Sequence, residues 1–395
     1  MTAPKLAKRK ECTGCLACVD TCTHNALSSY IGNDGHYYVQ INNQVCVGCL
    51  QCEKICPVVG RLQFDKSERA DFYASWNTNT DERKQSASGG VFSAMAHYII
   101  DHGGIVIGAA LDNCYDVKHK VVSSGDNLKQ LQGSKYIQSN TSGIYKQALG
   151  LLKNGKLVLF SGTGCQVAGL LSYLKDKKYE GRLVTVDLIC GGVPSRLLLK
   201  KFVENEPYQV EKIISFRTKD TGWKPKGFLY NLKVEDGDGQ VHNYAGKKNL
   251  VTTGFSLELT ERYSCYNCRF VGKNRLSDFT IGDLWGDTMY PEEHFDGLSL
   301  LVVHNQNALD LLLDMRDYLH TAPCDEKLAI KANSRLVNGQ NVRAYTWERH
   351  FMERLFTNCS YETLKKIYTN DYNLYSPWMI VKVIRFFYIR LLKGI

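Results

Sequence analysis

The chain has 395 residues, of which 44% are hydrophobic, and its formal net charge is +9. That length suits two or three domains with hydrophobic cores. No ladder of Arg and Lys with interleaved aromatic residues spans a domain, which argues against nucleic-acid binding. The positive charge would instead steer an acidic electron-carrier protein. Fifteen cysteines without an apolar export segment at the start predict a reducing cytoplasm and an anaerobic host.

Eight cysteines in the first sixty residues form two copies of the spacing C-x2-C-x2-C-x3-C. The copies are Cys12, Cys15, Cys18 and Cys22, then Cys46, Cys49, Cys52 and Cys56, with Pro57 after the last. This spacing is typical of ferredoxins with two [4Fe–4S] clusters, in which the fourth cysteine of each copy binds the other cluster. We therefore assign Cys12, Cys15, Cys18 and Cys56 to one cluster, and Cys22, Cys46, Cys49 and Cys52 to the other.

The alternatives to clusters fit this pattern poorly. Disulfides need an oxidising compartment, and a structural zinc site uses four cysteines rather than two runs of four. A radical-SAM enzyme would need a C-x3-C-x2-C run, which the sequence lacks. Thr23 replaces the proline that usually follows Cys22, and this affects a turn rather than a ligand.

After a polar linker at 65–71, apolar strands alternate with helical patterns. Strands are expected at 72–76, 103–111, 156–162 and 182–190, and helices at 86–104, 141–155, 164–176 and 195–204. This alternation predicts an α/β fold with a mainly parallel or mixed sheet. A β-rich insertion is expected from 213 to 244, with strands at 228–234 and 239–244, and helices dominate after 305. The expected domains are a small α+β ferredoxin domain at 1–64, a cofactor domain at 70–330 and a helical region at 331–395.

Two glycine-rich turns, 86–90 and 161–165, lead into helices. Unpaired N–H groups at a helix start can bind a phosphate, and glycine lets a ligand approach closely. Neither turn matches a Rossmann or a Walker A motif, and glycines also serve plain turns.

Four later cysteines, Cys165, Cys190, Cys265 and Cys268, are enough for a third cluster. The alternative for Cys165 and Cys190 is that they are ordinary buried thiols. Cys114, Cys324 and Cys359 are isolated and are interpreted as structural.

Five segments make the sequence recognisable: SASGGVFSAMAHYII (86–100), LQGSKYIQS (131–139), FSGTGCQVAGLLSYL (160–174), DLICGGVPS (187–195) and RYSCYNCRFVGKNRLSDFTIGDLWG (262–286). The chain resembles the β subunit of coenzyme F420-reducing hydrogenase and its dehydrogenase relatives from about 72 to about 320. The resemblance implies FAD, an iron–sulfur cluster and electron transfer between them. It also implies coenzyme F420 as the substrate in hosts that make it, whereas some relatives occur beside polysaccharide-synthesis genes.

The resemblance also implies roles for particular residues. It places Ser88, Gly89, Gly90, Lys135, Gly162 and Thr163 around the flavin, and Cys165, Cys190, Cys265 and Cys268 around the third cluster. Lys135 would stabilise the reduced ring, or would be a solvated surface lysine. Asp278 and Asp283 would hold ribityl hydroxyls or cap loops. Gly164 replaces a usual proline and Gly191 a frequent histidine, so catalytic residues and substrate contacts are not assigned.

The predicted function is an iron–sulfur flavoprotein oxidoreductase. A flavin takes up electrons singly and delivers them as a pair, so it can link clusters to hydride chemistry on coenzyme F420 or another small acceptor. The expected partner is an electron-carrier protein or a hydrogenase- or dehydrogenase-type partner. The alternative is a non-catalytic electron-transfer subunit that feeds a partner enzyme.

Two basic segments remain. Arg217, Lys219, Lys224 and Lys226 surround Trp223 and would bind an anion or form a solvated loop. The tail at 377–395 has the pattern of an amphipathic helix, which would contact a membrane surface or pack on protein. Its charges interrupt it too often for it to span a bilayer.

Overall fold

The computed structural model describes residues 4–60, 68–113, 115–219, 223, 230–245, 250–256, 258, 260–286, 290–339, 350, 353–354 and 357–369. The tail prediction at 377–395 and the structural interpretation of Cys114 lie outside these ranges. No helix in the described ranges has the length and apolar character needed to cross a membrane.

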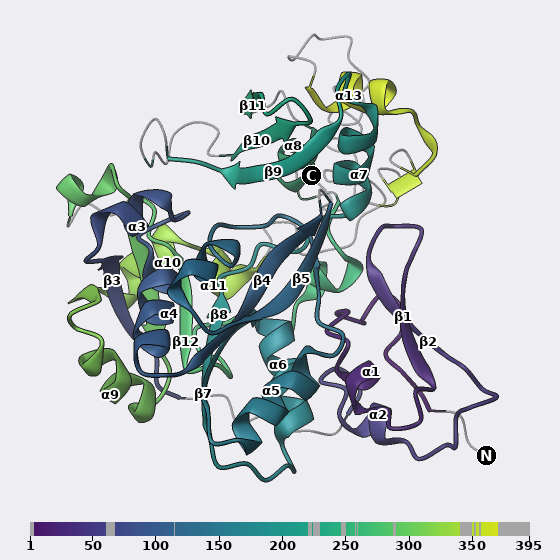
Figure 1. Ribbon diagram of the computed structural model, residues 1–395, viewed down its shortest axis with the longest axis horizontal. Coiled ribbons are helices and arrows are strands. Elements are labelled where there is room, and N and C mark those ends of the chain that lie inside the picture. Colours follow the sequence, from purple (N-terminus) through teal and green to yellow (C-terminus); the bar gives the residue numbers. More distant parts are fainter. Residues whose placement is uncertain are drawn as a thin grey trace, which may run out of the picture.

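The N-terminal unit holds two short helices and a hairpin, which lie beside α5 and α6 (Figure 1). Its elements are α1 (Ala17–Thr21), β1 (Leu27–Ile31), β2 (Tyr37–Ile41) and α2 (Gln51–Lys54). Strands β1 and β2 pair antiparallel. Leu16 and Leu50 precede the two helices with φ of 58° and 59°. A leucine rarely adopts this left-handed conformation, so its presence in both cysteine runs shows that the repeat extends to the backbone.

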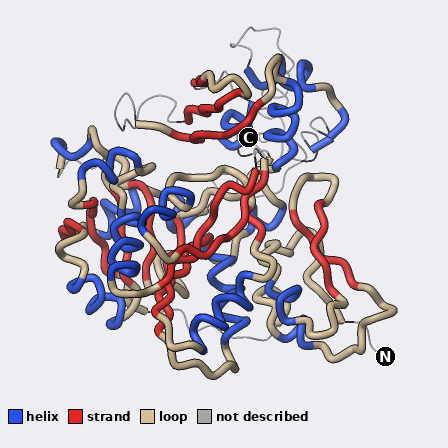
Figure 2. Tube along the Cα trace, viewed as in Figure 1, coloured by secondary structure: helices blue, strands red, loops and turns tan. Residues whose placement is uncertain are grey.

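A nine-stranded mixed sheet forms the centre of the molecule, as the strands in Figure 2 show. Its order is β14-β3-β13-β12-β8-β7-β4-β5-β6. The strands are β3 (Asp71–Asn77), β4 (Ile105–Asn113), β5 (Asp116–Val122), β6 (Ser139–Asn140), β7 (Leu157–Thr163), β8 (Arg182–Leu188), β12 (Phe279–Asp283), β13 (Ser299–Val303) and β14 (Leu319–Pro323). Strands β12, β8, β7 and β4 are parallel, and antiparallel pairs flank them. The expected α/β fold is confirmed, with a sheet that is mixed.

Helices cover both faces of this sheet. They are α3 (Thr80–Gln85), α4 (Val91–Asp101), η1 (Gly125–Gln130), α5 (Ile144–Lys153), α6 (Gly164–Leu174), η3 (Tyr263–Asn267), η4 (Pro291–His294), α9 (Gln306–Asp314), α10 (Glu326–Ala332) and α11 (Arg335–Asn338). Val106 and Leu159 pack in the core with α4 and α9, whereas Ile107 and Phe160 pack in the core with α5 and α6. This alternation is the period of two expected for a strand covered on both sides.

The β-rich insertion is a separate three-stranded antiparallel sheet, ordered β11-β10-β9. Its strands are β9 (Val210–Arg217), β10 (Tyr230–Asp236) and β11 (Val241–Ala245), and α7 (Arg196–Asn205), α8 (Leu250–Ser256) and α13 (Tyr361–Thr369) lie beside it (Figure 1). Leu199, Phe202 and Leu232 belong to the core that joins the sheet to the helices.

Two local expectations differ from the structure. The helix expected at 86–104 begins only at Val91, because residues 86–90 form a turn in which Gly90 has a φ of 81°. Strand β14 lies in the region after 305 where helices were expected to dominate, and it pairs with β3. Its sequence, LHTAP, is too short to show a strand period, so only the pairing reveals it.

Candidate cluster sites and cofactor cleft

The two cysteine runs surround two cavities. Cys12, Cys15, Cys18 and Cys56 line one cavity of about 120 Å³, the inner cluster cavity. Cys22, Cys46, Cys49 and Cys52 line the other, the outer cluster cavity. The structure thus brings together the same two crossed sets that the spacing assigns to the clusters. Every described cysteine is a free thiol. The clusters themselves stay a prediction.

Burial makes the inner cysteines poor thiolates on their own. Burial, together with the nearby Cys56 and Cys12, raises the pKa of the Cys15 thiol to about 12. The pKa of Cys18 is also raised well above its usual value by burial and by the neighbouring cysteines. A bound metal cluster compensates for this cost because cations deprotonate and neutralise the thiolates.

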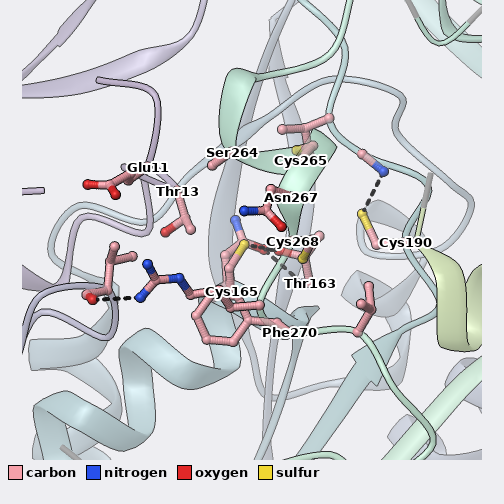
Figure 3. A pocket seen from close by; sticks show the side chains of 18 of the residues that line it. Glu11, Thr13, Thr163, Cys165, Cys190, Ser264, Cys265, Asn267, Cys268 and Phe270 are labelled. Carbon is pink, nitrogen blue, oxygen red and sulfur yellow. Dashed lines mark hydrogen bonds between the residues drawn. The ribbon is translucent and has the colours of Figure 1, made fainter. Parts of the chain in front are cut away.

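The four later cysteines also line one cavity, of about 100 Å³, which we call the third cluster cavity (Figure 3). Cys165 lies in the first turn of α6, and Cys190 comes two residues after β8. Cys265 lies in η3 and Cys268 directly follows it. These segments meet because β7 and β8 are adjacent parallel strands whose ends lie at the same edge of the sheet. The structure therefore brings together all four predicted ligands of the third cluster.

Hydrogen bonds and burial mark the sulfur atoms of this cavity. The Gly192 N–H donates to Cys190 Sγ at 3.3 Å, and Thr163 Oγ1 lies 3.1 Å from Cys165 Sγ (Figure 3). Burial raises the pKa of Cys190 to about 11 and that of Cys165 further, and Cys268 adds to the shift of Cys165. Among the described residues, no three His, Cys, Asp or Glu side chains converge on a single metal ion. A [4Fe–4S] cube is bound at four separate corners, so its cysteines stand around a body rather than a point.

A buried ion pair lies beside the third cluster cavity. Arg275 lines the cavity, and its Nη1 lies 3.1 Å from Asp187 Oδ2, with both side chains at most 3% exposed. Arg275 also donates to the carbonyls of Gly272 and Leu336. Arg275 does not stand out in the sequence, because a buried arginine has no distinct local signal.

A larger cleft of about 490 Å³ adjoins the third cluster cavity, a volume in the range of cofactor sites. Ser88, Gly90, Lys135, Gly162 and Thr163 line it, as expected for flavin contacts. Gly89 is not among the lining residues. A Cβ atom at Gly89 would lie 2.6 Å from the Ser75 carbonyl oxygen, so its small size is explained by packing against β3.

The cleft has features that fit a cofactor with a phosphate and a polar ring. Helix α4 begins at the cleft wall, and no side chain caps its first N–H groups. Such a helix start favours phosphate oxygens. Arg217 lines the same cleft, and its buried Nε has no hydrogen-bond partner within the described residues. The residues present therefore fit an FAD.

Lys135 is half-buried rather than a fully solvated surface lysine. Its Nζ donates to the carbonyls of Gln132 at 2.7 Å and Gln130 at 3.2 Å. Burial lowers the pKa of Lys135 to about 7. At this pKa the Lys135 amine is only partly charged near neutral pH, and an anion bound in the cleft would favour its charged form.

The two aspartates of the last recognisable segment have different places. Asp283 lines the cleft and forms a bidentate ion pair with Arg217, with distances of 2.9 and 3.0 Å. Asp278 accepts hydrogen bonds from Thr185 N and Oγ1 and does not line the cleft. Asp278 therefore links the start of β12 to β8, so its role here is structural rather than contact with a cofactor.

The basic segment around Trp223 is not a solvated loop where the structure describes it. Arg217 is buried in the pair with Asp283, and Lys219 Nζ donates to the Ser88 carbonyl at 2.7 Å. Trp223 stacks on Trp285 with ring centroids 4.2 Å apart. Lys224 and Lys226 lie outside the described residues.

The departure at Gly191 has a structural explanation. A Cβ atom at Gly191 would lie 2.4 Å from Arg335 Nη1, so the arginine occupies the space of a larger side chain there. Arg335 Nη2 pairs with Glu258 at 2.8 Å and the residue lines the cleft. Nothing local in the sequence marks Arg335, which lies 144 positions from Gly191.

The sites adjoin one another in series. Cys52 contributes to the raised pKa of Cys18, which places the outer and inner sets close together. Thr13 and Val58 line both the inner and the third cluster cavities. Thr163, Gln166 and Cys190 line both the third cluster cavity and the cleft, which completes the series.

This arrangement of cysteine cavities on an α/β fold is that of an iron–sulfur electron-transfer protein. Family profiles agree: a 4Fe-4S dicluster domain matches 11–59, and the N-terminal and C-terminal parts of the coenzyme F420 hydrogenase/dehydrogenase beta subunit match 72–146 and 155–327. The two parts of that subunit together cover more than half of the chain. The chain belongs to the coenzyme F420 hydrogenase/dehydrogenase beta-subunit family, with an N-terminal 4Fe-4S dicluster domain.

Individual relatives are distant. The chain is 24% identical over 255 residues to a subunit of the F(420)H(2) dehydrogenase of Methanosarcina mazei, and the match covers 61% of this chain and 69% of that protein. A solved structure, a xenon derivative of the F420-reducing [NiFe] hydrogenase complex from Methanosarcina barkeri, has a chain that is 18% identical to this one. Its TM-score is 0.44, and the match covers 68% of this chain and 90% of that one.

Proposed function

We propose that this protein is an FAD-dependent iron–sulfur oxidoreductase. Single electrons would pass through three [4Fe–4S] clusters to an FAD in the cleft, for two-electron chemistry on coenzyme F420 or another small acceptor. The observation that carries this proposal is the series of adjoining cavities. Each neighbouring pair shares lining residues or interacting cysteines, so every step of the route is between adjoining sites.

Fixed docking of the N-terminal unit supports the route. Thr141 Oγ1 and Tyr145 OH both donate to the Cys15 carbonyl, at 2.7 and 2.8 Å. Gln138 Nε2 donates to the Thr13 carbonyl at 3.0 Å. Gly169 of α6 has no side chain where Cys15 packs, since a Cβ atom there would lie 3.2 Å from Cys15 Sγ. These contacts hold the inner cysteines directly against the domain that contains the third set.

The cleft residues would bind and orient the FAD. The start of α4 near Ser88 and Gly90 would hold a phosphate, and Lys135 would stabilise negative charge on the ring. Ile137, Leu188 and Phe255 line the cleft and would exclude water from the ring. When bound, FAD supplies the exchange between single electrons and a hydride pair.

The acceptor and the partner follow from the family. Coenzyme F420 stands in the names of both the family and the curated relative, so we propose it as the first acceptor to test. A hydrogenase- or dehydrogenase-type partner is proposed on the same basis.

Cofactor counting on protein purified anaerobically tests the proposal. About twelve irons per chain, at four per cluster, with one FAD would support it. About eight irons with no flavin would refute it. The protein would then be an electron-transfer subunit whose later cysteines bind no cluster.

A further inference from the structure

Solvent reaches one cysteine of the outer cluster cavity more freely than it reaches any other described cysteine. Among the described cysteines, Cys49 alone is exposed, and it lines this cavity. Cys15 of the inner cavity is buried, and Cys165 and Cys190 of the third cavity are only partly exposed. An electron reaching the series from outside therefore has its shortest path at Cys49.

Apolar side chains stand exposed next to the outer cluster cavity. Val45 and Val47 flank Cys46 and are 43% and 45% exposed. Exposed valines around a solvent-facing redox site are typical of a surface that another protein covers. Small, transient interfaces of this kind are usual for electron-transfer pairs.

In the N-terminal unit, most of the exposed charged side chains are positive. Within residues 4–60, the exposed charged side chains are the cations Lys5, Lys8, Arg9, Lys10 and Lys54 and the single anion Glu11. Of the other acids, Asp20 and Asp34 face inward, and Glu53 of α2 is partly exposed. Asp20 accepts a hydrogen bond from the Tyr145 N–H, and Asp34 is fully buried beside Tyr38. The unit therefore presents a basic surface although its formal charges nearly balance.

Two of these cations lie beside the outer cavity. Lys54 ends α2, the helix that contains Cys52. The Lys5 N–H donates to Glu53 of the same helix at 2.8 Å, and the adjacent Pro4 lines the cavity. Positive charge next to a redox centre accelerates the encounter with an acidic partner.

We propose that the face formed by Lys5, Val45, Val47, Cys49 and Lys54 docks a small acidic electron-carrier protein. One electron leaves the carrier's own redox centre and enters the outer cluster, with no bond made or broken. The inference rests on the clusters of the proposed function and names where, and with what kind of partner, electrons enter. It does not depend on FAD, so it can fail or stand separately.

The test uses the cluster-loaded full chain and a dithionite-reduced acidic bacterial 2[4Fe–4S] ferredoxin as the probe. Stopped-flow absorbance follows cluster reduction and yields the second-order rate constant. The variant Lys5→Glu/Lys54→Glu is compared with Lys84→Glu/Lys327→Glu, which changes the net charge equally. The control lysines are exposed on α3 and α10, which lie on the opposite side of the molecule (Figure 1). Reduction by methyl viologen and an iron count verify that the clusters are intact.

The expected result is a fall of about tenfold or more in the ferredoxin rate constant for the docking-face variant at low salt, with the control unchanged. The difference should shrink at high salt because screening shortens the reach of the charges. Val45→Glu should also slow the reaction, whereas Val241→Glu, at a still more exposed valine on β11, should not. Equal rates for both charge variants would overturn the proposal. The proposal would also be overturned if methyl viologen reduced the wild-type chain and the ferredoxin did not. This face would then belong to an interface with a permanent partner subunit or with a second copy of the chain.

Discussion

Arg262 is the side chain on which we expect docking of the N-terminal unit to depend most. It is fully buried at the start of η3, the short helix that carries Cys265. Its Nε donates to the Cys12 carbonyl at 2.6 Å, and its Nη1 donates to Gln138 Oε1 at 3.2 Å. Its guanidinium also lies 4.3 Å from the Tyr38 ring centroid. The perturbation is Arg262→Met, which keeps the length and removes the charge.

The magnitude follows from the interactions that the substitution removes. Each hydrogen bond to a charged group contributes about 1.5–3 kcal/mol, and a desolvated cation–π interaction about 2 kcal/mol. The buried Nη2 of Arg262 has no hydrogen-bond partner within the described residues, and removing it recovers about 1–3 kcal/mol. We expect a net decrease of about 2–7 kcal/mol in the free energy that keeps the N-terminal unit docked, which is an increase of roughly 30-fold or more in its opening.

Hydrogen exchange followed by mass spectrometry measures that opening directly. The Tyr145 N–H donates to Asp20 across the joint, and the Tyr37 N–H donates to Gln138, so both amides lose protection when the unit detaches. Arg269→Met is the matched control, because Arg269 donates to the Val58 carbonyl across the same joint from an exposed position. Its cost should stay below about 1 kcal/mol. Equal exchange in the two variants would refute the argument that burial makes the Arg262 contacts decisive.

Three other predictions concern the cofactor sites. Cys165→Ser should lower the iron content from about twelve to about eight per chain, measured on anaerobically purified protein, and retention of all the iron would exclude Cys165 as a ligand. Arg275→Gln removes the buried cation beside the third cluster cavity, so reduction of that cluster should become about tenfold less favourable, or about 59 mV for one electron, in an EPR-monitored titration. An unchanged potential would mean that Asp187 cancels its charge at the cluster. Lys135 is charged below its pKa of about 7, so FAD affinity should weaken by up to about tenfold from pH 6 to pH 8. Fluorescence titration should show no such pH dependence for Lys135→Met, and a dependence identical to that of the wild type would assign it to another group.

Much of the fold is visible in local patterns. The alternation of strands and helices between 72 and 204 predicted β3, β4, β7 and β8 and the helices between them, because apolar periodicity is a property of neighbouring residues. Strands β13 and β14 were not predicted from the sequence, because they are defined by their antiparallel pairing with β3 rather than by a pattern of their own. The sheet is mixed, within the expectation of a mainly parallel or mixed sheet, and the pairing determines which strands are antiparallel.

At the cofactor cleft, the sequence could not decide which glycines and basic residues contact a ligand and which serve packing. Gly89 and Gly90 are adjacent in the same turn, yet Gly90 lines the cleft and Gly89 packs against β3. Whether a glycine serves a ligand or a packing contact depends on the strand opposite. In the same way, the sequence left open whether Arg217 and Lys219 bind an anion or form a solvated loop. In the structure, Arg217 pairs with Asp283, and Lys219 donates to the Ser88 carbonyl.

The sequence by itself determined the class of chemistry, because the spacing within each cysteine run sets which sulfurs can reach one cluster. It also singled out the four later cysteines and five of the residues that line the cleft, namely Ser88, Gly90, Lys135, Gly162 and Thr163. Only the tertiary structure decided the order of these sites and the joint that holds them in series. That joint consists of Gln138, Tyr145 and Arg262 reaching residues more than a hundred positions away. Contacts between such distant residues depend on how the elements pack, and no local pattern records them.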